Sequence, residues 1–282
     1  MSEPLLLSKD KEGKLHCLSN VCTHRGNLVV DRPCKLNDLR CKYHGRRFNL
    51  DGKFISMPEF KEVKNFPTEA DDLINLPMYQ WGKLLFASLG KKLPSELFFQ
   101  DMAKRIGWMP VQNFVFHPEL SKDYYIDAHW ALYCENYLEG FHIPYVHHGL
   151  NEIVDYGSYT TEMFRYSSLQ TGFDAAGEVA ARYLFVFPNL MFNFYPWGIS
   201  VNVVRPVSPS KSVVEFLTYV RDESLADKGA GADLHSVEME DEAVVESVQK
   251  GIRSRFYSQG RYSPTREQGT HHFHRLIAEF MG

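Results

Sequence analysis

The sequence predicts an α+β protein in which a small antiparallel β domain precedes a larger domain built from an antiparallel sheet and a long helix. Turn dipeptides separate the short apolar runs of the first hundred residues, as expected for short antiparallel strands. Apolar and polar residues alternate between positions 159 and 220, which indicates a second sheet. Over 234–254 the valines and Ile252 recur at helical spacing, which indicates one amphipathic helix.

The boundary between the two domains is expected near residue 100. The segment 95–107 reads as a connecting helix that ends at Gly107, so the predicted domains are 1–100 and 101–282. A strand followed by a helix is predicted from Tyr124 to Val146, and the helix should be disturbed at Pro144, because proline lacks a backbone donor.

The composition excludes several classes of protein. Hydrophobic residues make up 44% and charged residues 23% of the chain, near globular averages, so it is neither disordered nor fibrous. A net charge of −4 provides no basic field for nucleic acid, and a small-molecule substrate is expected instead. The longest uncharged stretch, 183–204, contains two prolines and reads as strands with a turn, so no membrane span is expected.

The N-terminus and the cysteines predict a cytoplasmic protein. The first residues lack a positive leader and a long apolar run, which argues against a secretory signal. Five cysteines, an odd number without scaffold spacing, fit a reducing compartment. Three of them, Cys17, Cys34 and Cys134, are expected to be ordinary core residues.

Two short motifs each carry a cysteine and a histidine. The segments VCTHRG and CKYHG contain Cys22-x-His24 and Cys41-x-x-His44, with sixteen residues between them. Two thiolates and two imidazoles are the ligands of a Rieske [2Fe-2S] cluster, in which the cysteines hold one iron and the histidines the other. A glycine ends each motif and permits a tight loop. The alternative is a structural zinc site, although zinc fingers usually pair Cys with Cys and His with His.

A second group of candidate ligands lies in ENYLEGFHIPYVHHGL, residues 135–150. Glu139 precedes His142 by three residues, which places both on one helical face, and His147 follows five residues later. A break at Pro144 would let His147 turn back toward a shared metal. From spacing alone, exposed histidines at a helix end are an equally good interpretation.

With both motifs present, the sequence resembles the Rieske non-haem iron oxygenases, the ring-hydroxylating family. Residues 1–85 resemble the cluster domain. The stretches HWALYCENYLEGFHIPYVH, FVFPNLMFNFYPWGISVNVVRP and GRYSPTREQGTHHFHRL resemble the group that includes choline, glycine betaine and carnitine monooxygenases. This resemblance implies a Rieske domain followed by a helix-grip catalytic domain, in which a curved antiparallel sheet wraps around a long helix with mononuclear Fe(II) in the cavity between them.

The resemblance also assigns roles at the iron. His142 and His147 are implied as two ligands of a facial triad, and the third is a carboxylate at the start of a late helix. In EMEDEAVVESVQKG, Asp241 falls on that position. Its neighbours of the same chemistry are Glu238, Glu240 and Glu242. The alternative interpretation of this acidic run is an ordinary charged, solvent-exposed helix face without a ligand.

Glu139 is implied as the bridge between the two metal centres, and Asn136 as a residue that orients the site. Family members usually carry aspartate at the bridging position, bonded to an iron-ligand histidine and to a cluster histidine of the next subunit. The implied electron path runs from His44 of one subunit to Glu139 and His142 of its neighbour. Such a head-to-tail contact closes as a ring. A homotrimer or a dimer of trimers is therefore expected.

The implied activity is an oxygenase that receives electrons from a reductase or ferredoxin and inserts oxygen from O2 into a small organic substrate such as a quaternary amine. Monooxygenation, with C–N bond cleavage or hydroxylation, is the first choice. The alternatives are an aromatic ring-hydroxylating dioxygenase and a non-catalytic Rieske electron-transfer protein, which would not need His142, His147 and Asp241. An aromatic run from Phe185 to Trp197 is expected to be strand core, with a cation-binding cage as the alternative.

Two features depart from the family pattern. Only twenty-one residues precede Cys22, where family members usually start earlier, so an unpaired edge in the cluster sheet is expected. Arg46 stands in place of the usual tryptophan. Arg46 and Phe48 also occupy positions where respiratory-type loops carry hydroxyl groups that bond the cluster sulfurs, which predicts a lower cluster potential.

Overall fold

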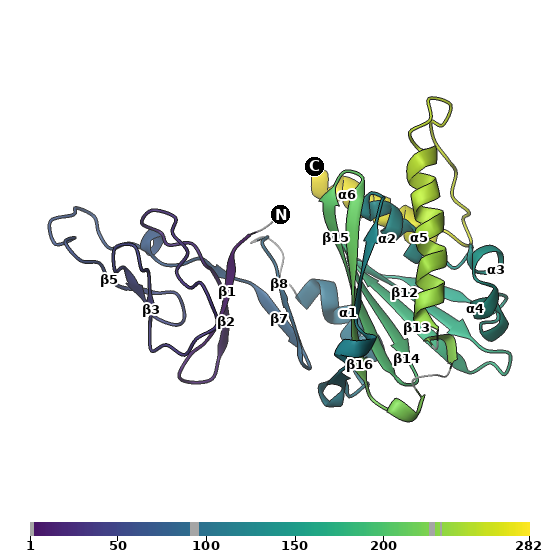
Figure 1. Cartoon of the computed structure of the whole chain (residues 1–282), viewed down its shortest axis with the longest axis horizontal. Coiled ribbons are helices and arrows are strands. Elements are labelled where there is room, and N and C mark those ends of the chain that lie inside the picture. The colour runs from purple at the N-terminus through teal and green to yellow at the C-terminus, as the bar shows by residue number, and fades with distance from the viewer. Residues whose placement is uncertain (1–2, 91–95, 226–228, 232) are drawn as a thin grey trace. The chain divides into compact units, whose positions relative to one another are not determined.

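The chain separates at the start of helix α1 into two units, Met1–Glu96 and Leu97–Gly282 (Figure 1). The computed structural model describes residues 3–90, 96–225, 229–231 and 233–282. The expected connecting helix is α1, Glu96–Ile106, and it ends before Gly107 as predicted, while the first residue expected in it lies outside the described part. Nowhere in the described residues is a helix both long and apolar enough to cross a membrane.

The first unit consists of short antiparallel strands joined by tight turns. Its strands are β1 Leu5–Lys9, β2 Leu15–Ser19, β3 Leu39–Arg40, β4 Arg47–Phe48, β5 Phe54–Ser56, β6 Asn75–Leu76, β7 Met78–Trp81 and β8 Leu84–Ala87, with the short helix η1 at Glu69–Asp71. They form the sheets β1-β2-β6 and β3-β4-β5 and the hairpin β7-β8. The turn before β5 places Gly52 at φ +90°, where an added Cβ would lie 3.0 Å from Leu18, so glycine is required there.

One continuous antiparallel sheet forms the frame of the second unit, as predicted for 159–220. Its strands are β9 Val115–Phe116, β10 Lys122–Ile126, β11 Thr160–Met163, β12 Ser167–Phe173, β13 Val179–Val186, β14 Leu190–Tyr195, β15 Gly198–Ser208 and β16 Lys211–Val220. Their order is β10-β16-β15-β14-β13-β12-β11, with β9 paired to β16. Consecutive strands from β11 to β16 are neighbours, so the sheet is a meander that β10 extends.

Helices cover one face of this sheet. They are α2 Trp130–Tyr137, α3 Ile143–Val146, α4 His148–Ile153, α5 Leu234–Gly251 and α6 Gln268–Met281, with short helices at η2 Val111–Asn113, η3 Pro118–Leu120, η4 Glu223–Leu225 and η5 Gly229–Gly231. The predicted long helix is α5, which runs in front of β12, β13 and β14 (Figure 1). Gln249 of α5 accepts the backbone N–H of His129, 2.7 Å away, and this bond fixes α5 beside the start of α2.

The helix predicted within 124–146 is wrong in its extent, because α2 ends at Tyr137. The carboxylate of Glu139 accepts the backbone N–H groups of Phe141 and His142, so these donors do not bond back along α2. Competition of a side-chain acceptor with the helix ladder is a general cause of helix ends. The result is a turn at 138–142 that separates α2 from α3.

Two smaller expectations also need correction. Pro144 does not interrupt a helix but lies in the first turn of α3, where a missing N–H costs nothing. Cys34 is exposed rather than a core residue, whereas Cys17 and Cys134 are buried as expected.

Candidate metal centres

Three side chains of the second unit bring their ligand atoms to one point. The Nε2 atoms of His142 and His147 are 3.1 Å apart, and Asp241 Oδ1 lies 3.0 Å from Nε2 of His147 and 3.5 Å from Nε2 of His142. Donor atoms about 2.1 Å from a metal and at right angles to one another are about 3.0 Å apart, so this triangle fits one face of an octahedral ion. Two imidazoles and one carboxylate are the donor set of a non-haem iron site.

The turn after α2 and the helix α5 together create this triangle. His142 is the N-cap of α3, and His147 lies between α3 and α4, so the short α3 turns His147 back toward His142. Asp241 reaches the pair from the second turn of α5. The five-residue spacing therefore brings the two histidines together across the short helix α3 rather than on one helical face.

Each of the three side chains has an outer partner. Glu139 Oε1 lies 2.6 Å from His142 Nδ1, and Glu240 Oε2 lies 2.7 Å from His147 Nδ1. Carboxylates on the far nitrogen of a histidine fix its tautomer and leave the other nitrogen as a lone-pair donor. Asn136 Nδ2 donates to Asp241 Oδ1 at 2.5 Å. This arrangement aims both Nε2 lone pairs at the same point.

The electrostatics of His147 also fit a cation. Burial alone would disfavour its imidazolium, but Asp241 and Glu240 more than offset this, and the pKa of His147 is raised. His147 is only 1% exposed, so a positive charge at this position is stabilised by carboxylates rather than by water. A bound metal ion would take the place of that proton.

The acidic neighbours of Asp241 point elsewhere. Glu238 accepts the Tyr133 hydroxyl at 2.6 Å, and burial raises the pKa of Glu238 well above its ordinary value. Glu240 contacts Nδ1 of His147, on the side of the ring away from the triangle, and does not contribute a donor atom to it. Sequence reasoning did not foresee the role of Glu240, because nothing in the run distinguishes it from the other glutamates.

The turn that carries Glu139 has no room for a side chain at position 140. A Cβ on Gly140 would lie 2.8 Å from the Tyr159 ring and 3.2 Å from Ile143. We expect Gly140→Ala to lower the free energy of unfolding by about 1–3 kcal/mol, because overpacking forces the neighbours apart. Gly149→Ala is the matched control: its Cβ meets nothing within 4 Å, and alanine in helix α4 should raise stability by up to about 1 kcal/mol. Urea unfolding of both variants measures the difference, and equal stabilities would contradict the packing argument.

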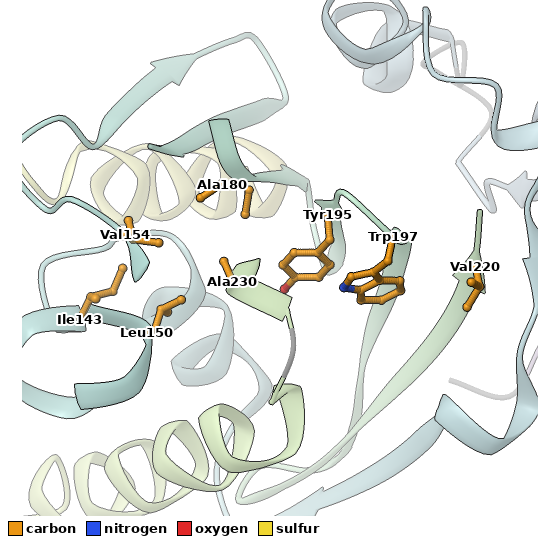
Figure 2. Close-up of a cluster of buried hydrophobic side chains, with 9 residues drawn as sticks. Ile143, Leu150, Val154, Ala180, Tyr195, Trp197, Val220 and Ala230 are labelled. Atoms are coloured by element: carbon orange, nitrogen blue, oxygen red, sulfur yellow. The ribbon is translucent and has the colours of Figure 1, made fainter. Parts of the chain in front are cut away.

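A cavity of about 90 Å³ adjoins the triangle. Its walls include four tyrosines, and these are Tyr137, Tyr159, Tyr183 and Tyr195. Figure 2 shows Tyr195 beside Trp197 and close to Ala230, and the two aromatic rings are stacked with centroids 5.1 Å apart. Asn193 and Asn202 add amide groups to the lining. No lysine or arginine is among the lining residues within the described part of the chain.

The aromatic run seen in the sequence is mostly core, as expected. Phe185 and Phe187 pack against Phe273 of α6, with centroids 5.6 and 6.1 Å away. Of that run, only Tyr195 lines the cavity. The other cavity tyrosines come from α2, from the segment before β11 and from β13. The sequence did not predict them as cavity residues, because a single aromatic residue forms no local pattern.

The two Cys–His motifs of the first unit form loops with the same hydrogen-bond pattern. Gly26 N–H donates to Cys22 O and Gly45 N–H donates to Cys41 O, both at 3.0 Å. Both glycines have positive φ, +72° and +76°, which explains why each motif ends in glycine. The imidazoles of His24 and His44 lie edge to face, with ring centroids 4.8 Å apart.

These four residues fit a two-iron cluster. Nδ1 of His44 is buried and has no hydrogen-bond partner among the described residues, so it is free to bind a metal. Burial opposes ionisation of both thiols: backbone N–H groups of Tyr43 and His44 lower the pKa of Cys41, whereas burial and the neighbouring Cys41 raise the pKa of Cys22. Among the described residues, His142, His147 and Asp241 form the one group of three possible ligands whose donor atoms all lie within 4.8 Å of one another. Two thiols on one side and two imidazoles on the other are the donor set of a Rieske [2Fe-2S] cluster.

Comparisons with known proteins match both units. The Rieske [2Fe-2S] domain matches residues 1–67, and the catalytic domain of the ring hydroxylating alpha subunit matches residues 158–282. Choline monooxygenase of Arabidopsis thaliana is 33% identical, over 96% of this chain and 70% of the relative. The Beta vulgaris enzyme is 30% identical, over 97% and 65%. The carnitine monooxygenase oxygenase subunit of Escherichia coli (strain K12) is 26% identical, over 99% and 81%.

Solved structures show the same fold. A quaternary ammonium Rieske monooxygenase aligns with a TM-score of 0.78 at 22% identity, covering 99% of this chain and 82% of that one. Naphthalene 1,2-dioxygenase from Rhodococcus sp. aligns with a TM-score of 0.72 at 16% identity, covering 98% and 83%. The chain spans 65–70% of the length of the plant choline monooxygenases.

Proposed function

Because this chain belongs to the Rieske non-haem iron oxygenases, we propose that it is an oxygenase that oxidises a small quaternary ammonium compound. The observation that carries this proposal is the His142, His147 and Asp241 triangle on the wall of a tyrosine-lined cavity. A triangle of three donors leaves the opposite face of an ion open to O2 and substrate. An electron carrier has no need of such a site.

The ligand roles follow from the two sites. We assign Cys22, His24, Cys41 and His44 to the [2Fe-2S] cluster and His142, His147 and Asp241 to the mononuclear iron. When bound, the cluster supplies single electrons and the iron supplies a centre for O2 reduction. Asn136 holds the Asp241 carboxylate in place, and Glu139 keeps a proton on the Nδ1 side of His142.

The cavity favours a cation that carries no carboxylate. Four tyrosine rings line it, and a quaternary ammonium group is attracted to the electron-rich face of an aromatic ring. A carboxylate on the substrate would need a basic partner, and the described lining has none. We therefore propose a choline-like amino alcohol as substrate in preference to a carnitine-like acid, with the amides of Asn193 and Asn202 beside its hydroxyl.

Binding of three ligands tests this substrate class. We expect choline to bind about 3- to 30-fold more tightly than 3,3-dimethyl-1-butanol, its neutral carbon isostere, because a cation–π contact contributes about 0.5–2 kcal/mol. Carnitine should bind more weakly than choline, since its carboxylate has no countercharge. Isothermal titration of the iron-loaded protein measures all three affinities. Equal affinity for choline and the isostere would contradict the tyrosine cage.

The oxygenase proposal itself is tested by metal analysis and oxygen uptake. Anaerobically purified protein should contain three irons and two acid-labile sulfides per chain, because the two sites are distinct. With a surrogate reductase, choline should stimulate O2 consumption in proportion to product, whereas naphthalene should not. Two irons with two sulfides and no substrate-dependent uptake would leave only a cluster protein.

We also propose a ring-shaped assembly and a separate electron donor, a reductase or ferredoxin. A second cavity of about 350 Å³ lies in the catalytic unit next to Glu139 and His142 and is lined further by Tyr257, Arg261 and Tyr262. This hollow gives the cluster domain of a neighbouring subunit access to Glu139. A reducing compartment such as the cytoplasm suits the thiolates that the cluster needs.

A further inference from the structure

Arg46 is a buried cation beside the cluster loops. It follows the second ligand loop, and its backbone oxygen accepts the N–H of Cys41 at 2.8 Å. The side chain is only 2% exposed. Its guanidinium carbon lies 5.0–5.8 Å from the ring centroids of Phe48, Phe54 and Phe66. Arginine is seldom buried this deeply without a strong partner, so its position calls for a reason.

Asp71 is that partner, and it also reaches the first ligand loop. Arg46 donates through Nη2 to Asp71 Oδ1 at 2.5 Å and to the Asp71 carbonyl oxygen at 3.2 Å. The same carbonyl oxygen accepts the hydroxyl of Thr23 at 2.8 Å. Thr23 stands between Cys22 and His24, so one backbone carbonyl links the two ligand loops.

The charge of Arg46 is only partly neutralised. Asp71 is 19% exposed, so water screens its carboxylate more than it screens Arg46. Nε of Arg46 is buried and has no acceptor among the described residues.

We propose that Arg46 is a positioning residue that ties the two cluster loops together through Asp71 and that its fixed positive charge raises the reduction potential of the cluster. Reduction adds one negative charge to the cluster, and a nearby cation in a low-dielectric site stabilises the added charge. The few hydroxyl donors around this cluster predict a low potential, and Arg46 opposes that tendency. The inference rests on the proposed cluster but not on the substrate or on turnover.

Redox titration of the whole chain loaded with its cluster tests this role. We expect Arg46→Gln to shift the ratio of reduced to oxidised cluster at fixed potential about tenfold or more toward the oxidised form, a fall of about 59 mV for a one-electron couple. Asp71→Asn should shift the potential upward, because it leaves the cation unopposed. Arg46→Lys keeps the charge and should stay near wild type even if Arg46→Gln fails to assemble its cluster.

Thr23→Val is the matched control, since it breaks the link between the loops without changing any charge. At the same fixed potential, its ratio of reduced to oxidised cluster should stay within about threefold of the wild-type ratio. The EPR signal of the reduced protein reports whether each variant keeps an intact cluster. Shifts of Arg46→Gln and Asp71→Asn in the same direction, or no shift in Arg46→Gln, would overturn the proposal. A wild-type protein without a cluster would instead refute the proposed function.

Discussion

Asp241→Ala should lose the mononuclear iron and keep the Rieske cluster. Asp241 supplies the one carboxylate oxygen in the triangle, and it contacts both histidines through the same atom. Loss of an outer partner typically weakens a metal site 10–100-fold, so loss of a ligand should cost more than about 100-fold in iron affinity. Iron per chain should fall from three to two while the visible absorption of the cluster persists. Substrate-dependent O2 uptake should disappear with the iron.

Glu240→Gln is the graded control for Asp241. Glu240 contacts the far side of His147 and does not enter the triangle. This variant should retain iron at saturating concentration but bind it about 10–100-fold more weakly. If Asp241→Ala kept three irons per chain, the third ligand would have to be a neighbouring glutamate.

Glu139→Gln should leave both metal centres loaded and slow turnover by about 100-fold or more. The Glu139 carboxylate holds Nδ1 of His142 at 2.6 Å and accepts two backbone N–H groups of the turn. Glutamine has a single acceptor oxygen and no charge, so it cannot serve all three donors. At saturating iron, the iron and sulfide counts should stay near wild type, as for Glu240→Gln, because the three ligand atoms remain. The rate of cluster reoxidation in the presence of O2 and substrate should fall. A wild-type rate would remove Glu139 from the electron path.

Glu135→Gln is the matched control for this change. Glu135 lies four residues earlier, in α2, and it pairs with His274 rather than with a candidate iron ligand. Its turnover should remain near wild type. Co-expression of a Glu139→Gln chain with a Cys41→Ser chain tests whether the path crosses between subunits. Partial recovery of activity in the mixed assembly is expected, because a cluster from one chain can then serve an intact Glu139 on the other.

The chemistry of this protein could be predicted from the sequence because it resides in short segments. The interleaved Cys–His motifs and their glycines are local, since each loop closes on itself through one hydrogen bond and one positive φ. The alternation of apolar and polar residues across 159–220 predicts strands, and the helical spacing of apolar residues across 234–254 predicts a helix. Both predictions need only the pattern of residues that are to be buried. These features depend on few contacts between distant residues.

The tertiary structure decided how those segments meet. The helix expected up to Val146 ends at Tyr137, because the Glu139 carboxylate takes backbone donors that a helix would otherwise use. The choice of Asp241 over its neighbours depends on the rotation of α5 about its axis, which no local pattern encodes. The tyrosine cavity and the pairing of Arg46 with Asp71 likewise join residues far apart in the chain. Motifs and the family resemblance identified the candidate ligands in the sequence, and packing of the turn after α2 against α5 brought the donor atoms of His142, His147 and Asp241 to one point.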